Sequence, residues 1–176
     1  MLGPHPLDLA EALAHLELQR LAWLYCHAVD RGDMQLLRSL YHDDAIDEHG
    51  EMFTGKADEY VAWLPKALVG VDAVRHEITN MLFVIDGDTA QGQLLNTAYH
   101  RTGDREVVIG GRYLDRYERR DGVWRILHRS LVTDTIEQRA TSSAGGFIGK
   151  GVARGTKGPD DPVFARLDRF RPTAGE

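Results

Sequence analysis

The stretch VVIGGRYLDRYERRDGVWRILHRSLVTD, residues 107–134, carries the clearest architectural signal in the chain. Asp121-Gly122 lies between two runs rich in Val, Ile, Tyr and Trp, which is the strongest short-range pattern for a β-hairpin. We therefore expect two long antiparallel strands here, and we expect whatever the protein binds to lie against them.

Two turns are compatible with this hairpin, and they place its side chains differently. With Asp121-Gly122 as a two-residue loop, Tyr113 lies opposite Ser130. With a three-residue loop that also includes Arg120 and has its glycine in a left-handed bulge, Tyr113 lies opposite Arg129. A slip of one residue exchanges the two faces of a strand, so the pattern alone leaves the faces of the hairpin open.

The composition indicates one domain with its own core. The chain has 176 residues, of which 43% are hydrophobic and 27% are charged, and its formal net charge is −6. This negative balance argues against nucleic acid as a partner, because phosphate contacts need a basic face. The single cysteine, Cys26, excludes an intramolecular disulfide. No apolar run approaches the roughly 20 residues of a membrane span, and the N-terminus lacks a signal-peptide pattern, so we expect no membrane partner and a cytoplasmic location.

Helices come first in the sequence and long strands follow. Apolar positions at three- and four-residue steps predict an amphipathic helix over about residues 7–31, with a stripe formed by Leu9, Leu13, Leu16, Leu21, Leu24 and Ala28. Asp33 can cap a short second helix, and a third helix is expected at about 56–68, after a short strand pair at 45–53. Four long strands are expected at about 74–85, 89–101, 106–119 and 123–134, separated by turns rich in Gly and Asp.

This order of elements predicts an α+β fold. The helices would pack on one face of a curved, mixed or antiparallel sheet, which can wrap around them as a cone with an internal pocket. We assign residues 1–137 to this domain. Residues 138–176 form a Gly-rich tail with the apolar anchors Phe147, Ile148, Val163, Phe164 and Phe170, and we expect the tail to pack over its own domain or over a neighbouring subunit.

Sharp local motifs for cofactor-dependent chemistry are absent from the sequence. It contains no phosphate-binding glycine loop, no HExxH, no paired CxxC and no GxSxG. We therefore expect no organic cofactor. A metal site formed by Asp47, His49 and His76 has no converging ligand spacing, so we expect no metal either.

Three polar residues occupy positions that suit chemistry as well as structure. Asp30 ends the first helix, where a carboxylate faces the negative end of the helix dipole, although it can also serve as a simple turn cap. His76 points to the apolar side of its strand, where most histidines are satisfied core residues. Arg129 lies beside Leu127 and Leu131, and a buried guanidinium there needs an anion or a carbonyl nearby.

Four segments of the chain together resemble a known family. They are YCHAVD at 25–30, HEITN at 76–80, IGGRY at 109–113 and YERRDGVW at 117–124. Over about residues 13–135 the chain is similar to the SnoaL-like branch of the nuclear-transport-factor-2-like superfamily. Within that branch it resembles the hexachlorocyclohexane dehydrochlorinases and, more distantly, the scytalone dehydratases. The resemblance implies a cystatin-like α+β barrel and, from the related dehydratases, a homo-oligomer that is a trimer.

The resemblance also implies a catalytic site. In those lyases an Asp at the end of the first helix and a His on the first long strand form a dyad with the His as base, and these positions match Asp30 and His76. The dehydrochlorinases also use an Arg on the last strand, which matches Arg129, and a pocket aromatic, which matches Tyr113. Both positions line one pocket only if Tyr113 and Arg129 share a face, so the resemblance selects the three-residue turn.

Departures from the family pattern make the expected pocket more polar. The lysine five residues before the catalytic Asp is replaced by Tyr25, a tryptophan by Asp47, and an apolar pocket position by His49. We expect Tyr25, His49, Trp63 and Tyr113 to bind the substrate. An oxygenated cyclic or aromatic compound suits such a pocket better than a chlorinated hydrocarbon.

The resulting prediction is a cofactor-free lyase that acts on a small molecule by β-elimination. His76 would abstract a proton, Asp30 would fix its tautomer, and Arg129 would stabilise the departing group or an enolate. The same pocket suits isomerisation of an unsaturated ketone or a retro-aldol cleavage. Two further alternatives are a non-catalytic binding module and a small subunit like the β subunit of ring-hydroxylating dioxygenases, in which Asp30 and His76 would be structural.

Overall fold

The computed structural model describes residues 3–141 and 151–171. The helices are α1 (Leu9–Arg31), α2 (Met34–Ser39) and α3 (Ala57–Ala67), with α4 (Pro162–Arg166) and the 3-10 helix η2 (Asp168–Phe170) in the tail. The strands are β1 (Tyr41–Glu48), β2 (Thr54–Lys56), β3 (Ala73–Asp86), β4 (Thr89–Thr102), β5 (Arg105–Arg120) and β6 (Val123–Ala140). Within these residues, none of the helices combines the length and the apolar content that a membrane crossing needs.

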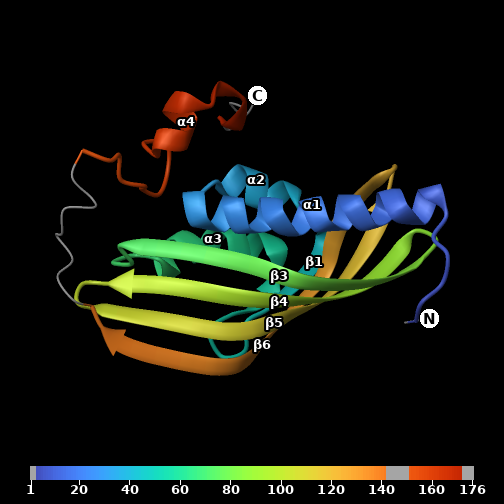
Figure 1. Ribbon diagram of the computed structural model, residues 1–176, viewed down its shortest axis with the longest axis horizontal. Coiled ribbons are helices and arrows are strands. Elements are labelled where there is room, and N and C mark those ends of the chain that lie inside the picture. The colour runs from blue at the N-terminus through green and yellow to red at the C-terminus, as the bar shows by residue number, and fades with distance from the viewer. Residues whose placement is uncertain (1–2, 142–150, 172–176) are drawn as a thin grey trace.

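A mixed sheet of six strands forms the body of the domain, in the order β2-β1-β6-β5-β4-β3. Strands β3 to β6 pair antiparallel in succession, whereas β1 runs parallel to β6. The edge strands β2 and β3 do not pair with each other, so the sheet stays open. Figure 1 shows α1 lying across one face of the curved sheet, with α2 and α3 on the same side. The predicted α+β fold is confirmed, as an open cone and not a closed barrel.

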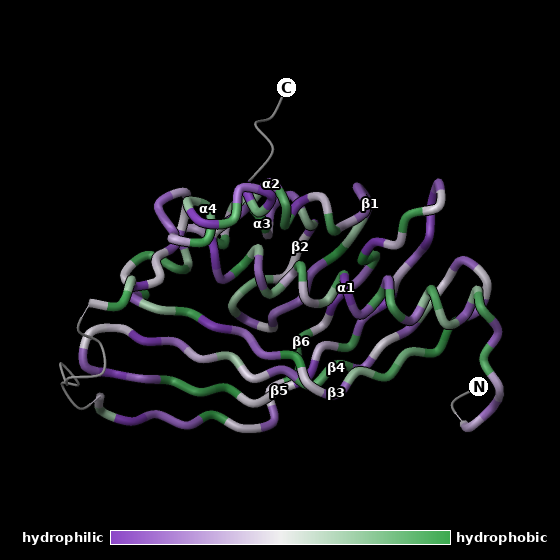
Figure 2. Tube along the Cα trace, turned by 45° about the horizontal axis from the view of Figure 1, so that its top comes forward, coloured by the Kyte–Doolittle hydropathy of each residue, from purple (hydrophilic) through white to green (hydrophobic). Residues whose placement is uncertain are grey.

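The core lies between the helices and this inner face of the sheet. Helix α1 contributes residues such as Leu18, and the strands contribute residues such as Leu94 and Ile126, all of them fully buried. Figure 2 shows polar and apolar segments following one another along the long strands, which is the pattern of a sheet with one covered face.

The predicted stripe of α1 is confirmed only in the second half of the helix, where Leu21 and Ala28 are buried and Leu24 packs against the core. Leu9, Leu13 and Leu16 are exposed. The residues that face the sheet are Ala14, Leu18, Leu21, Ala22, Tyr25, Cys26, Ala28, Val29 and Asp30. Both sets have helical spacing, so periodicity alone does not choose between them. At the end of the helix the contact with the sheet is polar, because Asp30 accepts from the backbone and the side chain of His76 on β3.

The β5–β6 hairpin has the two-residue turn, so the predicted three-residue turn is wrong. Arg120 pairs with Val123, and both loop residues have positive φ, 52° at Asp121 and 76° at Gly122, as a type I′ turn requires. The pairing register shifts further along β6. Tyr117 pairs with Ile126 and Arg116 pairs with His128, which leaves Leu127 as an extra residue without a partner, a β-bulge.

This bulge places Arg129 on the same face of the sheet as Tyr113, as the three-residue turn would have done. An extra residue exchanges the two faces of a strand. Beyond Leu127, Arg129 therefore lies opposite Asp115, and Leu131 lies opposite Tyr113. Arg129 and Tyr113 are both buried on the inner face, as predicted, but the bulge and not the turn places them there.

The described part of the tail packs against the C-terminal end of α1. Arg31 Nη1 donates to Asp161 Oδ2 at 2.9 Å, and Lys157 Nζ donates to two carbonyl oxygens in the loop that precedes β3. Phe164 is buried with its ring edge-on to His27. Residues 151–171 thus contact the domain of their own chain, while Phe147 and Ile148 lie outside the described residues.

Candidate active site

Asp30 and His76 meet between the end of α1 and the first half of β3. The imidazole Nδ1 donates to Asp30 Oδ1 at 2.7 Å, and the backbone N–H of His76 donates to Asp30 Oδ2 at 2.9 Å. Both side chains keep 10% exposure. No hydrogen-bond partner of His76 Nε2 is found in the part of the chain that the structure describes. A carboxylate on Nδ1 fixes the proton there, which leaves the Nε2 lone pair for a ligand.

The local structure compensates for the unfavourable place of this carboxylate. Asp30 lies in the last turn of α1, just before the left-handed C-cap Gly32, where the helix dipole disfavours negative charge. Two N–H donors from a single residue, His76, offset that effect. The interaction therefore also ties the helix end to the sheet.

A second histidine, His100 on β4, lies beside His76 with the ring centroids 5.9 Å apart and the rings perpendicular. Burial and the neighbouring His76 lower the pKa of His100, although Asp30 opposes this effect. Sequence reasoning missed His100. The signal that could have found it is the alternation along β4, which places Leu94, Asn96, Ala98 and His100 on one face.

Arg129 is buried between two tyrosine rings, with its guanidinium carbon 4.0 Å from the ring centroid of Tyr25 and 4.0 Å from that of Tyr113. Its Nε and Nη2 donate to Asp115 at 2.9 and 2.6 Å. Burial opposes the charge, but Asp115 holds the pKa of Arg129 well above its usual value. Nη1 is buried without a hydrogen-bond partner among the described residues. The guanidinium thus has the counter-ion that its burial demands and keeps one nitrogen for a ligand.

Asp115 was not singled out from the sequence. It lies on the inner face of β5 between Tyr113 and Tyr117, and the Tyr117 hydroxyl donates to its Oδ2 at 2.5 Å. The two-residue alternation Tyr113-x-Asp115-x-Tyr117 places the carboxylate on this face, but only the register of β6 shows that Arg129 is its partner.

A second carboxylate–imidazole pair lies on β1 and just after it. Asp47 is fully buried and accepts the Tyr41 hydroxyl at 2.6 Å and His49 Nδ1 at 2.5 Å. The His49 ring stacks on Tyr60, with centroids 5.1 Å apart, and its centroid lies 6.4 Å from that of Tyr113. Within residues 3–141 and 151–171, no three His, Cys, Asp or Glu side chains converge as metal ligands.

Three of the four expected substrate-binding residues thus gather around Arg129. The rings of Tyr25 and Tyr113 sandwich it, and His49 lies next to Tyr113. The fourth, Trp63, is half-buried at the periphery, with its ring 5.3 Å from that of Phe53.

The tyrosines of this cluster act as neutral hydrogen-bonding groups. Tyr25 and Tyr60 share a hydrogen bond of 2.7 Å between their hydroxyl oxygens. Burial raises the pKa of Tyr25, Tyr41, Tyr60 and Tyr113 well above the ordinary value, and Asp47 raises each of them further. These hydroxyls are therefore donors and not bases at neutral pH.

Asn96 on β4 presents an unpaired acceptor to the same interior. Its side chain is 4% exposed, and Oδ1 has no hydrogen-bond partner within the described residues. In the sheet Asn96 pairs with Gly111. A side chain would not fit at Gly111, because its Cβ would lie only 2.4 Å from the carbonyl oxygen of Val132. Among the described residues, three buried side-chain atoms are without a hydrogen-bond partner: the donors Arg129 Nη1 and Trp124 Nε1 and the acceptor Asn96 Oδ1.

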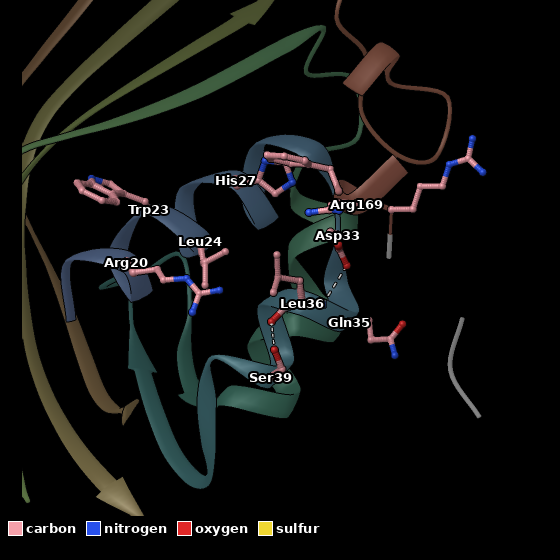
Figure 3. Close-up of a pocket in the computed structure, with 11 residues that line it drawn as sticks. Arg20, Trp23, Leu24, His27, Asp33, Gln35, Leu36, Ser39 and Arg169 are labelled. Atoms are coloured by element: carbon pink, nitrogen blue, oxygen red, sulfur yellow. Dashed lines mark hydrogen bonds between the residues drawn. The ribbon is translucent and has the colours of Figure 1, made fainter. Parts of the chain in front are cut away.

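Two open cavities on the described part of the chain lie away from the dyad. One of about 700 Å³ lies on the outer side of α1 and α2, against η2, and Trp23, His27 and Phe170 are among its lining residues (Figure 3). The other, of about 470 Å³, lies over strands β3 to β6 and includes Leu82 and His128. Neither is lined by Asp30 or His76, but the exposure of both side chains shows that solvent reaches the dyad.

The SnoaL-like domain family matches residues 10–130, which is more than half of the chain. The chain belongs to this family. The matched region contains Asp30, His76, Asn96, Asp115 and Arg129, and it ends before the tail. A search of the curated proteins found no match.

Solved structures with a similar fold include two hexachlorocyclohexane dehydrochlorinases and a dehydratase. The type 2 dehydrochlorinase LinA has a TM-score of 0.72 and 22% identity, over 80% of this chain and 100% of that one. A second LinA structure has a TM-score of 0.68 and 26% identity, over 79% and 95%. A "putative scytalone dehydratase" from Novosphingobium aromaticivorans has a TM-score of 0.67 and 20% identity, over 77% and 95%. The SnoaL-like resemblance of the sequence segments is confirmed.

Proposed function

We propose that this protein is a cofactor-independent lyase in which His76, oriented by Asp30, removes a proton from a carbon of a small oxygenated substrate. The observation that carries the proposal is the 2.7 Å bond between His76 Nδ1 and Asp30 Oδ1, with Nε2 left unpaired on a solvent-accessible ring. The names of the similar structures support it, because dehydrochlorination and dehydration are both eliminations.

In this mechanism Nε2 of His76 takes the proton, and the electrons of the C–H bond form a C=C bond as the leaving group departs. Asp30 stabilises the imidazolium that forms. The lowered pKa of His100 keeps this neighbour neutral, so it adds no positive charge beside the imidazolium.

The unpaired interior groups favour a class of substrate. Arg129 Nη1 would donate to a carbonyl oxygen and stabilise the enolate that develops on it. Asn96 Oδ1 would accept a hydroxyl proton. Buried polar groups are costly until they are paired, so a ligand with both functions gains from binding here. A hydroxylated cyclic or aromatic ketone has both functions, whereas a chlorinated hydrocarbon has neither.

Proton abstraction can be tested with 3-hydroxycyclohexanone as a probe ketone. Deuterium exchange at its α-carbon in D₂O reports the base, and cyclohexenone formation reports the elimination. His76→Gln and Asp30→Asn should each reduce exchange, His76→Gln by about 10²- to 10⁴-fold, the range of general-base catalysis. The control is His128→Gln, because His128 also pairs with a carboxylate, Glu48, but on the other face of the sheet. Undiminished exchange in His76→Gln would refute the proposal.

The assembly and location of the protein stay predictions. We predict a homo-trimer, as the resemblance implies, a small molecule as the ligand, and a cytoplasmic location. Analytical ultracentrifugation of the full chain measures the first of these directly.

A further inference from the structure

Asp47 and His49 repeat the geometry of the Asp30–His76 pair. In both pairs the imidazole Nδ1 contacts a carboxylate oxygen, at 2.5 Å for His49 and 2.7 Å for His76. Both imidazole side chains keep 10% exposure. No partner for Nε2 of His49 is found in the described ranges either. The molecule thus has two imidazoles that are each oriented by a carboxylate and open at Nε2.

Packing alone would not favour a carboxylate at the buried position of Asp47. Asp47 has no exposed surface, and a buried carboxylate is destabilising unless each oxygen is bound. Tyr41 binds one oxygen and His49 the other, so both carboxylate oxygens have a partner, and the oxygen on His49 Nδ1 fixes the orientation of the imidazole.

Arg129 lies near the Asp47–His49 pair and is linked to the Asp30–His76 pair through Cys26. On one side, the Tyr113 ring packs on the guanidinium and lies next to the His49 ring. On the other side, the Cys26 thiol, whose pKa burial raises to about 12, is influenced by both Arg129 and Asp30. A substrate whose carbonyl oxygen is bound by Arg129 Nη1 would lie near His49, and the proposed function requires its α-carbon to face His76.

We propose that His49, held by Asp47, is the general acid that protonates the leaving group, and that this leaving group is an oxygen. The inference rests on the proposed function and narrows its substrate class to β-hydroxy or β-alkoxy ketones. Hydroxide and alkoxide leave poorly without a proton, whereas chloride needs none. A site that eliminates chloride would not need the Asp47–His49 pair as a proton donor.

The proton balance of the step is complete. His76 takes the α-proton, and the C–H electrons become the C=C bond. The C–O bond breaks with its electrons on oxygen, which takes the proton from His49 Nε2 and leaves as water or an alcohol. His49 is left neutral and His76 protonated, and one proton returned through solvent from His76 to His49 restores the starting state.

The test compares two leaving groups on one ring, in 3-hydroxycyclohexanone and 3-(4-nitrophenoxy)cyclohexanone. Nitrophenoxide departs without protonation, so it does not need the acid. His49→Gln should reduce water elimination by about 100-fold or more, the contribution of general acid catalysis, and should reduce nitrophenoxide release far less. His128→Gln is again the matched control and should leave both rates unchanged.

Three outcomes distinguish a failure of the acid role of His49 from a failure of the base role of His76. A loss in His49→Gln that is confined to the hydroxyl substrate supports the acid role, and nitrophenoxide release in the same variant shows that it is folded. Equal losses with both leaving groups, or no loss with either, overturn the acid role while α-deuterium exchange still reports His76. Exchange that persists in His76→Gln overturns the proposed function itself.

Discussion

Asp115 faces Arg129 across the β5–β6 ladder, and the two side chains form a bidentate ion pair that is completely buried. The pair holds the guanidinium plane between the rings of Tyr25 and Tyr113. It therefore positions Nη1, the guanidinium nitrogen that has no hydrogen-bond partner among the described residues.

Breaking this pair should cost stability. Asp115→Asn is expected to lower the free energy of unfolding by about 3–5 kcal/mol, because Arg129 would keep a buried charge without its counter-ion. Urea denaturation at pH 7 measures the change. The control is Asp134→Asn, which breaks the bidentate Arg112–Asp134 pair on the exposed part of the same two strands and should have little effect. Similar losses in both variants would contradict this account.

The thiol of Cys26 should be unreactive in the folded protein. Burial raises its pKa from 9.0 to about 12, so almost no thiolate is present at pH 8. Ellman's reagent should label it only as fast as the protein unfolds. Because the unfolded thiol ionises at lower pH, stability should fall as the pH rises from 9 towards 12. Labelling of the native protein at the rate of a free thiol would show that the side chain is not buried.

His100 should make the fold sensitive to acid. Burial and His76 lower its pKa below the ordinary 6.5, so the unfolded state binds a proton at a higher pH than the folded state does. The stabilisation is complete above pH 6.5 and is lost as the pH falls through the folded-state pKa. Melting temperatures of the wild type and of His100→Gln at pH 5 and 7.5 measure it. The variant should lose less stability on acidification, and an equal loss would assign the effect to other groups.

Asp161 should hold the described part of the tail in place. It is buried and accepts from Arg31 and from the backbone N–H groups of Thr156 and Val163. Asp161→Ala should therefore increase trypsin cleavage after Arg154 and Lys157, while the rest of the chain stays resistant. Asp160→Ala, at the exposed neighbouring position, is the matched control. Unchanged cleavage in Asp161→Ala would mean that other contacts hold the tail.

The elements of the fold could be predicted because their signals are local. Gly and Asp turns and two-residue alternation mark the four long strands, and Asp33 marks the start of α2 through its bond to the Leu36 N–H. The bulge at Leu127 has no such signal. Neither glycine nor proline marks it, and only the pairing of Arg129 with Asp115 beyond it shows that the register has shifted.

The candidate site was predictable only where a family resemblance supplied positions. Asp30 and His76 are 46 residues apart, and periodicity cannot show that they meet. Asp115 and Asn96 needed the strand register, which a single extra residue changes. Leu13 is exposed although it has the same helical spacing as the buried residues of α1, so periodicity alone could not show which side faces the sheet.

The bulge at Leu127 separates the length of the turn from the face on which Arg129 lies. Tyr117 pairs with Ile126 and Arg116 with His128 on the two sides of the bulge, so a relative without Leu127 would still place Arg129 opposite Asp115. An extra residue in the loop between Arg120 and Val123 would likewise leave the ladder pairs unchanged. In evolutionary terms, insertions and deletions at these two positions should therefore occur independently of each other. An ungapped alignment across a single such change would match Arg129 with the wrong residue.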